Sequence, residues 1–451
     1  MKMGFIAISG LRTYNAELTK LGLTLPGFVE RNKIIASLPS LGLLTLAGMT
    51  PKDIDVEYVE VEDIRKIDEL PGDFDVVAIS SFSGQIKDAY ELADRFRARK
   101  TIVLLGGLHV TAQPNEAAAH ADSIVIGEGE PVWPQLVDDL KNQRLRSSYD
   151  SRETPFDFSD APMPRYELLD PARYNRFTVQ TQRGCPFNCE FCAASIRLNP
   201  LYRVKPVHKV ISEIRYIKEL WPNPFIEFAD DNTFANKKHA KDLLRALVPE
   251  SVRWFTETDI SVARDDELLA LMQDSGCSQV LIGFESASLS GLIGLEGKSD
   301  WKAKQFDFYY SAIEKIQSYG ISVNGCFILG LDGTGPESFQ NVRDFVRESG
   351  LHDVQITIQT PFPGTPLYNR LRNAGRLLKE NAWELCTLFD VNFVPDRMTT
   401  AELQENFLWL AEELYSEDAT RERKNKFYDQ LRRLIKHKRL QRRSNYERKA
   451  S

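Results

Sequence analysis

The chain has 451 residues, of which 42% are hydrophobic and 27% are charged, and its formal net charge is −7. This length predicts two or three domains, each able to bury its own core, and the composition excludes a disordered or fibrous protein. No apolar run approaches the roughly 20 residues that a membrane-spanning helix needs, and the N-terminus favours a first buried strand over a signal peptide.

Residues 1–145 predict a doubly wound α/β domain built on a parallel sheet. Short runs rich in Val and Ile alternate with helical periodicity, which is typical of strands buried between two layers of helices. We expect strands at 3–9, 56–61, 75–80, 101–105 and 123–126, and helices at 41–49, 85–99 and 130–141. No GxGxxG motif follows a strand, so the sequence does not favour dinucleotide binding.

Small and polar residues follow three of these strands, at the sheet edge where doubly wound domains bind ligands. Such residues let a bulky ligand approach the backbone. The candidate ligand contacts are Ser80, Ser81, Ser83, Gly106, Gly107, Gly127 and Glu128. We interpret His109 and His120 as loop or surface histidines.

Residues 146–176 are polar and contain several prolines, so they predict a connector that runs across the surface between two domains. Beyond them, strand and helix patterns alternate again. Six strands are expected, at 177–182, 224–228, 253–256, 279–284, 322–329 and 353–360. Six βα units predict an incomplete (β/α) barrel, in which the chemistry gathers at the C-terminal ends of the strands.

Three cysteines share one short loop after the first of these strands. Cys185, Cys189 and Cys192 form a CxxxCxxC pattern. A closed zinc site normally has four protein ligands, and an electron-carrier cluster normally has four cysteines. Three thiolates can instead hold three irons of a 4Fe–4S cluster and leave the fourth iron open to a small molecule. From the spacing alone, a zinc knuckle completed by His208 or three unrelated buried thiols remain alternatives.

Carboxylates follow two other strands of the predicted barrel. Asp230 and Asp231 come after the second strand, and Glu285 with Ser286 comes after the fourth. Taken alone, the aspartates are also compatible with a helix N-cap. The remaining cysteines, Cys277, Cys326 and Cys386, are too far apart in the sequence to suggest a second cluster, and we interpret them as buried packing thiols.

The cysteine loop, with the aromatic Phe191 before its last cysteine, resembles that of the radical S-adenosylmethionine (SAM) enzymes. The resemblance implies a 4Fe–4S cluster whose open iron binds SAM, and whose electron cleaves SAM to a 5′-deoxyadenosyl radical. It also implies an external electron donor such as flavodoxin or ferredoxin. It further implies SAM contacts from these residues: Phe191, Asp230, Asp231, Glu285, Ser286 and Arg203, the last of which could instead form an internal salt bridge.

The N-terminal domain resembles the cobalamin-binding domain that precedes the barrel in many radical SAM enzymes. The resemblance rests on segments 38–44, 75–80, 106–109 and 127–130, and on a turn at 360–368 that is similar to one in cobalamin-fused relatives. The DxHxxG motif, whose histidine binds cobalt in other cobalamin enzymes, is absent. Bound cobalamin would therefore lack that ligand, and a domain that keeps the fold without the cofactor remains open.

These patterns divide the chain into a cobalamin-binding-like domain at 1–145, a connector at 146–176, a partial barrel at 177–370 and a helical C-terminal domain at 371–451. Residues 421–451 carry 13 Lys and Arg against 3 Asp and Glu. We interpret this basic segment as a solvated helix face or frayed tail and expect no nucleic-acid partner.

The implied activity is cobalamin-dependent methylation of an unactivated carbon in a small-molecule or lipid-like substrate. A radical dehydratase, cyclase or rearrangement enzyme of the same architecture, without cobalamin, is the alternative, and a non-enzymatic cobalamin sensor is a further one. An oxygen-sensitive cluster needs a reducing compartment, so we expect a cytoplasmic protein.

Overall fold

The computed structural model describes the chain except for residues 10–12, 16, 19–37, 194–200, 298 and 451. The described residues form two compact units. Unit 1 contains residues from 1–18, 38–235 and 359–394, and unit 2 contains residues from 236–358 and 395–450. The predicted C-terminal domain at 371–451 does not coincide with either unit, since its first part belongs to unit 1.

Unit 1 begins with an alternation of strands and helices. Its elements are β1 (Lys2–Ile8), α2 (Leu41–Met49), β2 (Asp55–Val61), η1 (Ile64–Lys66), β3 (Val76–Ser80), η2 (Ser83–Gln85), α3 (Ile86–Ala98), β4 (Ile102–Gly106), α4 (Leu108–Ala112), α5 (Pro114–Ala117), η3 (Ala118–His120), β5 (Ser123–Ile126), α6 (Trp133–Lys141) and β6 (Ser148–Asp150). The five predicted strands and three predicted helices are confirmed. The short β6 was missed because Ser-Tyr-Asp carries no apolar run.

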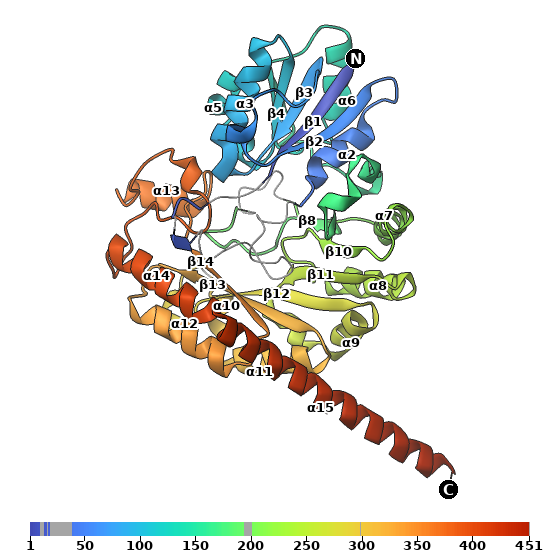
Figure 1. Cartoon of the computed structure of the whole chain (residues 1–451), viewed down its shortest axis with the longest axis vertical. Coiled ribbons are helices and arrows are strands. Elements are labelled where there is room, and N and C mark those ends of the chain that lie inside the picture. The colour runs from blue at the N-terminus through green and yellow to red at the C-terminus, as the bar shows by residue number, and fades with distance from the viewer. Residues whose placement is uncertain (10–12, 16, 19–37, 194–200, 298, 451) are drawn as a thin grey trace. The chain divides into compact units, whose positions relative to one another are not determined.

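The first sheet is parallel throughout, with strand order β2-β1-β3-β4-β5-β6 (Figure 1). Its two faces bury separate cores. Ile6 and Ile8 of β1 pack in the core that contains α3, whereas Phe5 and Ala7 pack in the core that contains α6. This alternation along one strand is what a sheet covered on both faces requires. β2 pairs with one side of β1, and the chain then crosses to β3 on the other side of β1. The boundary between β1 and β3 is therefore the topological switch point of the sheet.

The connector at 146–176 is more buried than the sequence predicted. It contains η4 (Phe158–Asp160), η5 (Tyr166–Leu168) and η6 (Pro171–Arg173). Phe158 and Tyr166 are buried, and the Tyr166 hydroxyl donates to the carbonyl of Thr178 at 2.8 Å. Many other residues of the connector are exposed, and these aromatic side chains anchor it to β7 (Phe177–Val179).

The remaining parallel strands divide between the two units. β7 and β10 pair in unit 1, and unit 2 contains a sheet with order β14-β13-β12-β11. The strands and the helices that follow them are β7 (Phe177–Val179), β8 (Gln182–Arg183), β9 (Arg203–Val204), α7 (Val207–Leu220), β10 (Phe225–Phe228), α8 (Lys237–Leu247), η8 (Val248–Glu250), β11 (Arg253–Thr258), η9 (Ile260–Arg264), α9 (Asp266–Asp274), β12 (Cys277–Glu285), η10 (Leu289–Gly291), α10 (Trp301–Lys304), η11 (Phe306–Phe308), α11 (Tyr309–Ser318), β13 (Ser322–Leu329), α12 (Glu337–Glu348) and β14 (Asp353–Ile358).

All six predicted barrel strands are present, but the first is shorter than expected. β7 ends at Val179, and Gln182-Arg183 instead forms a two-stranded antiparallel pair with Arg203-Val204. In unit 2, helices follow the strands (Figure 1), and aromatic rings join the two layers. The ring centres of Phe284 in β12 and Phe327 in β13 lie 5.7 Å apart, and both rings contact Phe345 of α12.

The chain ends with α13 (Pro366–Asn373), η12 (Trp383–Leu385), α14 (Thr400–Tyr415) and α15 (Glu417–Ala450). α14 begins with a capping box, in which the side chains of Thr399 and Glu402 each accept from the other's N–H, and it lies within the segment predicted to be helical. None of the helices in the described part of the chain combines the length and apolar composition needed to cross a membrane.

Two glycines of α2 should respond in opposite ways to replacement by alanine. A Cβ at Gly48 would lie 2.2 Å from the carbonyl oxygen of Met163 in the connector, whereas nothing lies within 4 Å of a Cβ at Gly42. Alanine is intrinsically better than glycine in a helix by about 1 kcal/mol. We therefore expect Gly42→Ala to raise the free energy of unfolding by up to about 1 kcal/mol, and Gly48→Ala to lower it, in urea unfolding. Stabilisation by both changes would contradict the close packing of the connector on α2.

Candidate active site

The three cysteines of the CxxxCxxC pattern lie on the loop between β8 and β9, in unit 1. Cys185, Cys189 and Cys192 are partly exposed, as is Phe191. None of the six cysteines, all of which are among the described residues, forms a disulfide. Three accessible thiols within eight residues are a donor set that suits an iron–sulfur cluster.

Two arginines lie opposite each other at the neck of this loop, because β8 and β9 pair with Arg183 beside Arg203. Like charges in such a position repel each other. Glu128, which follows β5, contacts both of them. Arg183 Nη1 donates to Glu128 Oε1 at 2.7 Å, and Arg203 Nη2 donates to the same oxygen at 2.6 Å. The other oxygen accepts from Arg203 Nη1 at 3.0 Å and from the Phe156 N–H at 2.9 Å.

Glu128 therefore belongs to an internal ion-pair network. Its side chain is 0% exposed. Burial by itself would raise the pKa of Glu128, but the guanidinium groups of Arg203 and Arg183 and the Phe156 N–H bring it below its usual value. The cofactor contact predicted for Glu128 stays a prediction, and of the two roles considered for Arg203 the structure shows the salt bridge.

Asp230 is also used inside the protein. The N–H groups of Thr181 and Gln182 donate to Oδ1 at 2.8 and 3.0 Å, and the hydroxyls of Thr181 and Thr233 donate to Oδ2 at 2.5 and 2.9 Å. These bonds end β7 and turn the chain into β8, and the SAM contact predicted for Asp230 stays a prediction. Asp231, by contrast, is exposed. Neither aspartate caps a helix, since the side chain of Asn236 caps α8.

A third carboxylate, that of Glu190, lies on the loop itself, between the second and third cysteines. Arg370 of α13 donates to both oxygens of Glu190, from Nε at 2.9 Å and from Nη2 at 2.6 Å. The N–H of Leu367 donates to the Glu190 carbonyl at 3.0 Å. The turn at 360–368 therefore has a structural use, because it places α13 against the cysteine loop. Sequence reasoning missed this ion pair, whose partners are 180 residues apart.

The carboxyl edge of the first sheet collects most of the other predicted ligand contacts. Ser9 follows β1 and Ser81 follows β3, on the two sides of the switch point. Their hydroxyl oxygens are buried and have no hydrogen-bond partner among the described residues. Gly107 has a φ of 107°, and a Cβ there would lie 3.1 Å from Ser80 Oγ. Gly106 ends β4, and Gly127, with a φ of 88°, follows β5. Phe82, which the sequence analysis did not single out, is 66% exposed at this edge.

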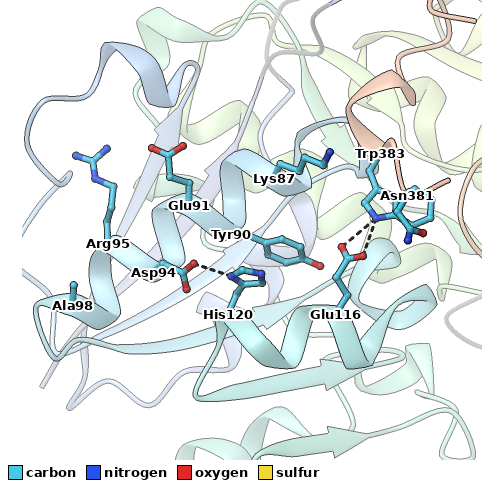
Figure 2. Close-up of a pocket in the computed structure, with 10 residues that line it drawn as sticks. All are labelled: Lys87, Tyr90, Glu91, Asp94, Arg95, Ala98, Glu116, His120, Asn381 and Trp383. Atoms are coloured by element: carbon cyan, nitrogen blue, oxygen red, sulfur yellow. Dashed lines mark hydrogen bonds and ion pairs between the residues drawn. The ribbon is translucent and has the colours of Figure 1, made fainter. Parts of the chain in front are cut away.

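Both histidines of this domain, His109 and His120, contact other side chains of the domain. His109 is buried in the first turn of α4, not on a loop or surface as predicted, and its Nδ1 lies 3.1 Å from Ser83 Oγ. His120 contacts Asp94 and stacks on Tyr90 (Figure 2). Ser83 therefore has a protein contact, and its predicted ligand contact stays a prediction.

A groove of about 770 Å³ runs along the outer side of α3, lined in part by Tyr90, His120 and Glu116 (Figure 2). None of the predicted site residues lines it. Trp383 of η12 closes one end and donates from Nε1 to both oxygens of Glu116, at 3.1 and 3.0 Å. The groove therefore marks where segment 359–394 is attached to the first sheet, and we do not assign it to the active site.

In unit 2, Glu285 and Ser286 lie at the end of β12 as predicted. Glu285 has a φ of 64°, a left-handed conformation that costs a non-glycine residue about 1–3 kcal/mol. Lys302 Nζ donates to Glu285 Oε1 at 2.8 Å and to the Gly283 carbonyl at 3.0 Å. A Cβ at Gly283 would lie 2.3 Å from Glu285 Oε1, so glycine is needed there for the carboxylate to fold back.

One face of the unit 2 sheet carries buried amides. The strand registers place Gln279 of β12, Asn324 of β13 and Gln355 of β14 on the same face as Cys326. Asn324 is 0% exposed, and neither of its amide atoms has a hydrogen-bond partner among the described residues; the same holds for the amide oxygens of Gln279 and Gln355. Barrel interiors are mostly filled by branched apolar side chains. A face of unsatisfied amides instead suits a polar ligand or ordered water.

Comparison with known proteins identifies both the region that contains the cysteine loop and the region that contains most of the first sheet. Residues 179–346 match the radical SAM superfamily, residues 32–137 match the B12 binding domain, and residues 365–450 match a domain of unknown function, DUF4070. The bacteriochlorophyllide d C-12(1)-methyltransferase of Chlorobaculum tepidum is 30% identical over 86% of this chain and 84% of its own length. The chain belongs to the B12-binding radical SAM methyltransferases.

Two further comparisons agree with this membership. The hopanoid C-2 methylase of Rhodopseudomonas palustris is 28% identical over 77% of this chain and 67% of its own length. Among solved structures, the cobalamin-dependent SAM radical enzyme OxsB, with aqua-cobalamin and SAM bound, superposes with a TM-score of 0.67 over 95% of this chain and 70% of its own. Its 14% identity makes this a likeness of fold.

The residues fit the cofactors of this family. The three thiols supply one ligand for each of three irons. The switch-point edge offers two unsatisfied hydroxyls, a glycine backbone and an exposed aromatic ring, which suit a large ligand with both polar and apolar surface. His208, considered as a zinc ligand, lies in α7, and in the described part of the chain no three His, Cys, Asp or Glu side chains are grouped to hold a single ion.

Asp230 should make the folded protein more stable in acid. Burial raises its pKa to about 6, against the donors that lower it, whereas an unfolded aspartate titrates near about 3.9. The folded state therefore binds more protons between these values, so this contribution to stability is lost as the pH rises through about 6. We expect the free energy of unfolding of the wild type, relative to Asp230→Asn, to fall by about 1 kcal/mol between about pH 5 and 7 in urea unfolding. A difference that grows with pH would show that the four donors outweigh burial.

Proposed function

We propose that the protein methylates an unactivated carbon of a small, largely apolar substrate, with its cluster held by Cys185, Cys189 and Cys192. When bound, the cluster supplies the electron that cleaves SAM, and cobalamin carries the methyl group to be transferred. One observation carries the proposal. The cysteine loop and the first sheet belong to one compact unit, and Glu128, at the carboxyl edge of that sheet, binds the two arginines at the neck of the loop.

The residues of the chain have three tasks in this proposal. The thiols bind irons and leave one iron open for the amine and carboxylate of SAM. Phe191, which lies on the cysteine loop, and the exposed Asp231, which follows Asp230, are proposed to contact SAM. In unit 2, Glu285 is proposed to contact the ribose or amino-acid end of SAM, because the strained backbone and Lys302 hold its carboxylate in one orientation.

The substrate class is inferred from relatives and from chemistry. The names of two relatives give a bacteriochlorophyllide and a hopanoid as methyl acceptors. Both are polycyclic molecules with a large apolar surface, and we propose an acceptor of that kind. The buried amides around Asn324 would then face the polar part of SAM or of the substrate.

We also propose an external electron donor such as flavodoxin or ferredoxin and a cytoplasmic location. A cluster held by three thiolates must be re-reduced for each SAM cleaved, and it survives only where oxygen and disulfide formation are limited.

Cys189→Ala should abolish both SAM cleavage and methyl transfer, because the cluster would keep only two protein ligands. The wild type, expressed with cobalamin and purified without oxygen, should contain about four irons and about one cobalamin per chain. With SAM labelled in the methyl group, mass spectrometry should detect 5′-deoxyadenosine and label on the chain's cobalamin.

The matched control is Cys277→Ala, which removes a buried thiol at the start of β12 and should keep iron content and SAM cleavage. Four irons without cobalamin would contradict the methyl-transfer proposal while leaving radical chemistry intact. Full SAM cleavage by Cys189→Ala would contradict the cluster assignment itself.

Phe82→Ala should weaken cobalamin binding without loss of stability. Phe82 is 66% exposed, so its removal opens no cavity, but it removes apolar contact area at the switch-point edge. We expect a fall of about tenfold in cobalamin affinity, measured by equilibrium dialysis of anaerobic protein. Leu378→Ala, which removes another exposed apolar side chain of unit 1, is the control and should bind cobalamin like the wild type.

A further inference from the structure

The neck of the cysteine loop is held by a residue from outside the radical SAM domain. Residues 179–346 match the radical SAM superfamily, whereas Glu128 follows β5, the last strand within the matched B12-binding region. Its carboxylate contacts Arg183 on one side of the neck and Arg203 on the other. Arg183 lies two residues before Cys185, so a shift of this arginine is passed directly to the first cluster ligand.

The alternatives for holding this neck are few. β8 and β9 are two residues each, and two-stranded pairs of this length have little stability of their own. The two arginines that face each other across the pair would repel without a carboxylate between them. Arg183 is also bound by Glu130, at 2.8 Å, and its guanidinium lies 4.9 Å from the ring centre of Phe158. Gln180, within the radical SAM region, also accepts from Arg183 Nη2 at 2.9 Å, but it is neutral. The B12-binding domain therefore supplies the carboxylates, Glu128 and Glu130, that balance the charge of the two arginines.

We propose that Glu128 is a positioning residue for the iron–sulfur cluster, which sets the geometry of the cysteine loop from the B12-binding domain by neutralising and aligning Arg183 and Arg203. This inference rests on the proposed assignment of Cys185, Cys189 and Cys192 as cluster ligands. It means that the B12-binding domain has a second task besides holding cobalamin: the cluster loop reaches its working geometry only when that domain is folded beside it.

The test is Glu128→Gln, which keeps the shape of the side chain and removes its charge. Both arginines would then lie buried with one fewer negative partner, and Gln can accept bonds through only one oxygen. We expect iron to be retained after anaerobic reconstitution, together with a changed electron paramagnetic resonance spectrum of the reduced cluster and a shifted reduction potential. Loss of such supporting contacts typically costs 10–100-fold, so SAM cleavage should fall by about tenfold or more.

Two further variants separate positioning from simple folding. Glu130→Gln leaves Glu128 in place and removes one partner of Arg183, so it should give a smaller change of the same kind. The double variant Glu128→Gln/Arg203→Gln removes one positive charge along with the negative one, and the spectrum should return toward that of the wild type. Asp150→Asn, at an exposed ion pair of the same sheet, is the matched control and should leave all three readouts unchanged.

The outcomes distinguish this inference from the proposed function. A Glu128→Gln protein whose spectrum, reduction potential and SAM cleavage match the wild type would overturn the inference. If Glu128→Gln does not fold, the comparison of Glu130→Gln with Asp150→Asn decides: identical spectra and potentials in those two would overturn it. The proposed function fails separately, if wild-type protein assembles the cluster and transfers no methyl group.

Discussion

A carboxylate that is wholly buried between two arginines cannot exist without them, and they cannot lie so close together without it. Removing the carboxylate takes this acidic partner from Arg203 and leaves Arg183 with Glu130, so positive charge that is mostly shielded from water loses its compensation. Glu128, Arg183 and Arg203 form such a group, and they come from two different domains. The β5 edge of the first sheet and the neck of the cysteine loop are therefore bound to be ordered together, and the relative placement of the two follows from this one interaction.

The same edge of the first sheet is divided between two uses. At β5, Glu128 is turned inward to the arginines, whereas at the β1/β3 switch point Ser9 and Ser81 retain hydroxyls without a protein partner. His109 lies in α4, and its Nδ1 is 3.1 Å from Ser83 Oγ. Cobalamin bound here would have no histidine from His109 to ligate cobalt, which agrees with the missing DxHxxG motif.

The features that the sequence predicted correctly are local ones. The strands of both sheets follow from runs of four to eight residues, and the cysteine pattern spans only eight. The partners of Glu128 lie 55 and 75 residues away, and Arg370 lies 180 residues from Glu190. No periodicity encodes such pairs, so the sequence could not show that Glu128 and Asp230, both predicted to contact a cofactor, also make these internal contacts. β7 shows the same limit within the fold. The strand predicted at 177–182 ends at Val179, because Asp230, 49 residues from Thr181, takes the N–H groups of Thr181 and Gln182.

Three carboxylates thus surround the cysteine loop, and each is used to hold protein. Glu128 fixes its neck, Asp230 fixes the turn that leads into it, and Glu190 ties its middle to α13. A structural metal site obtains its rigidity from a full set of protein ligands. A cluster that must leave one iron open has only three, so the rigidity has to come from the surrounding protein. The distribution of these carboxylates around the loop, and not among the ligands, is what that chemical requirement predicts.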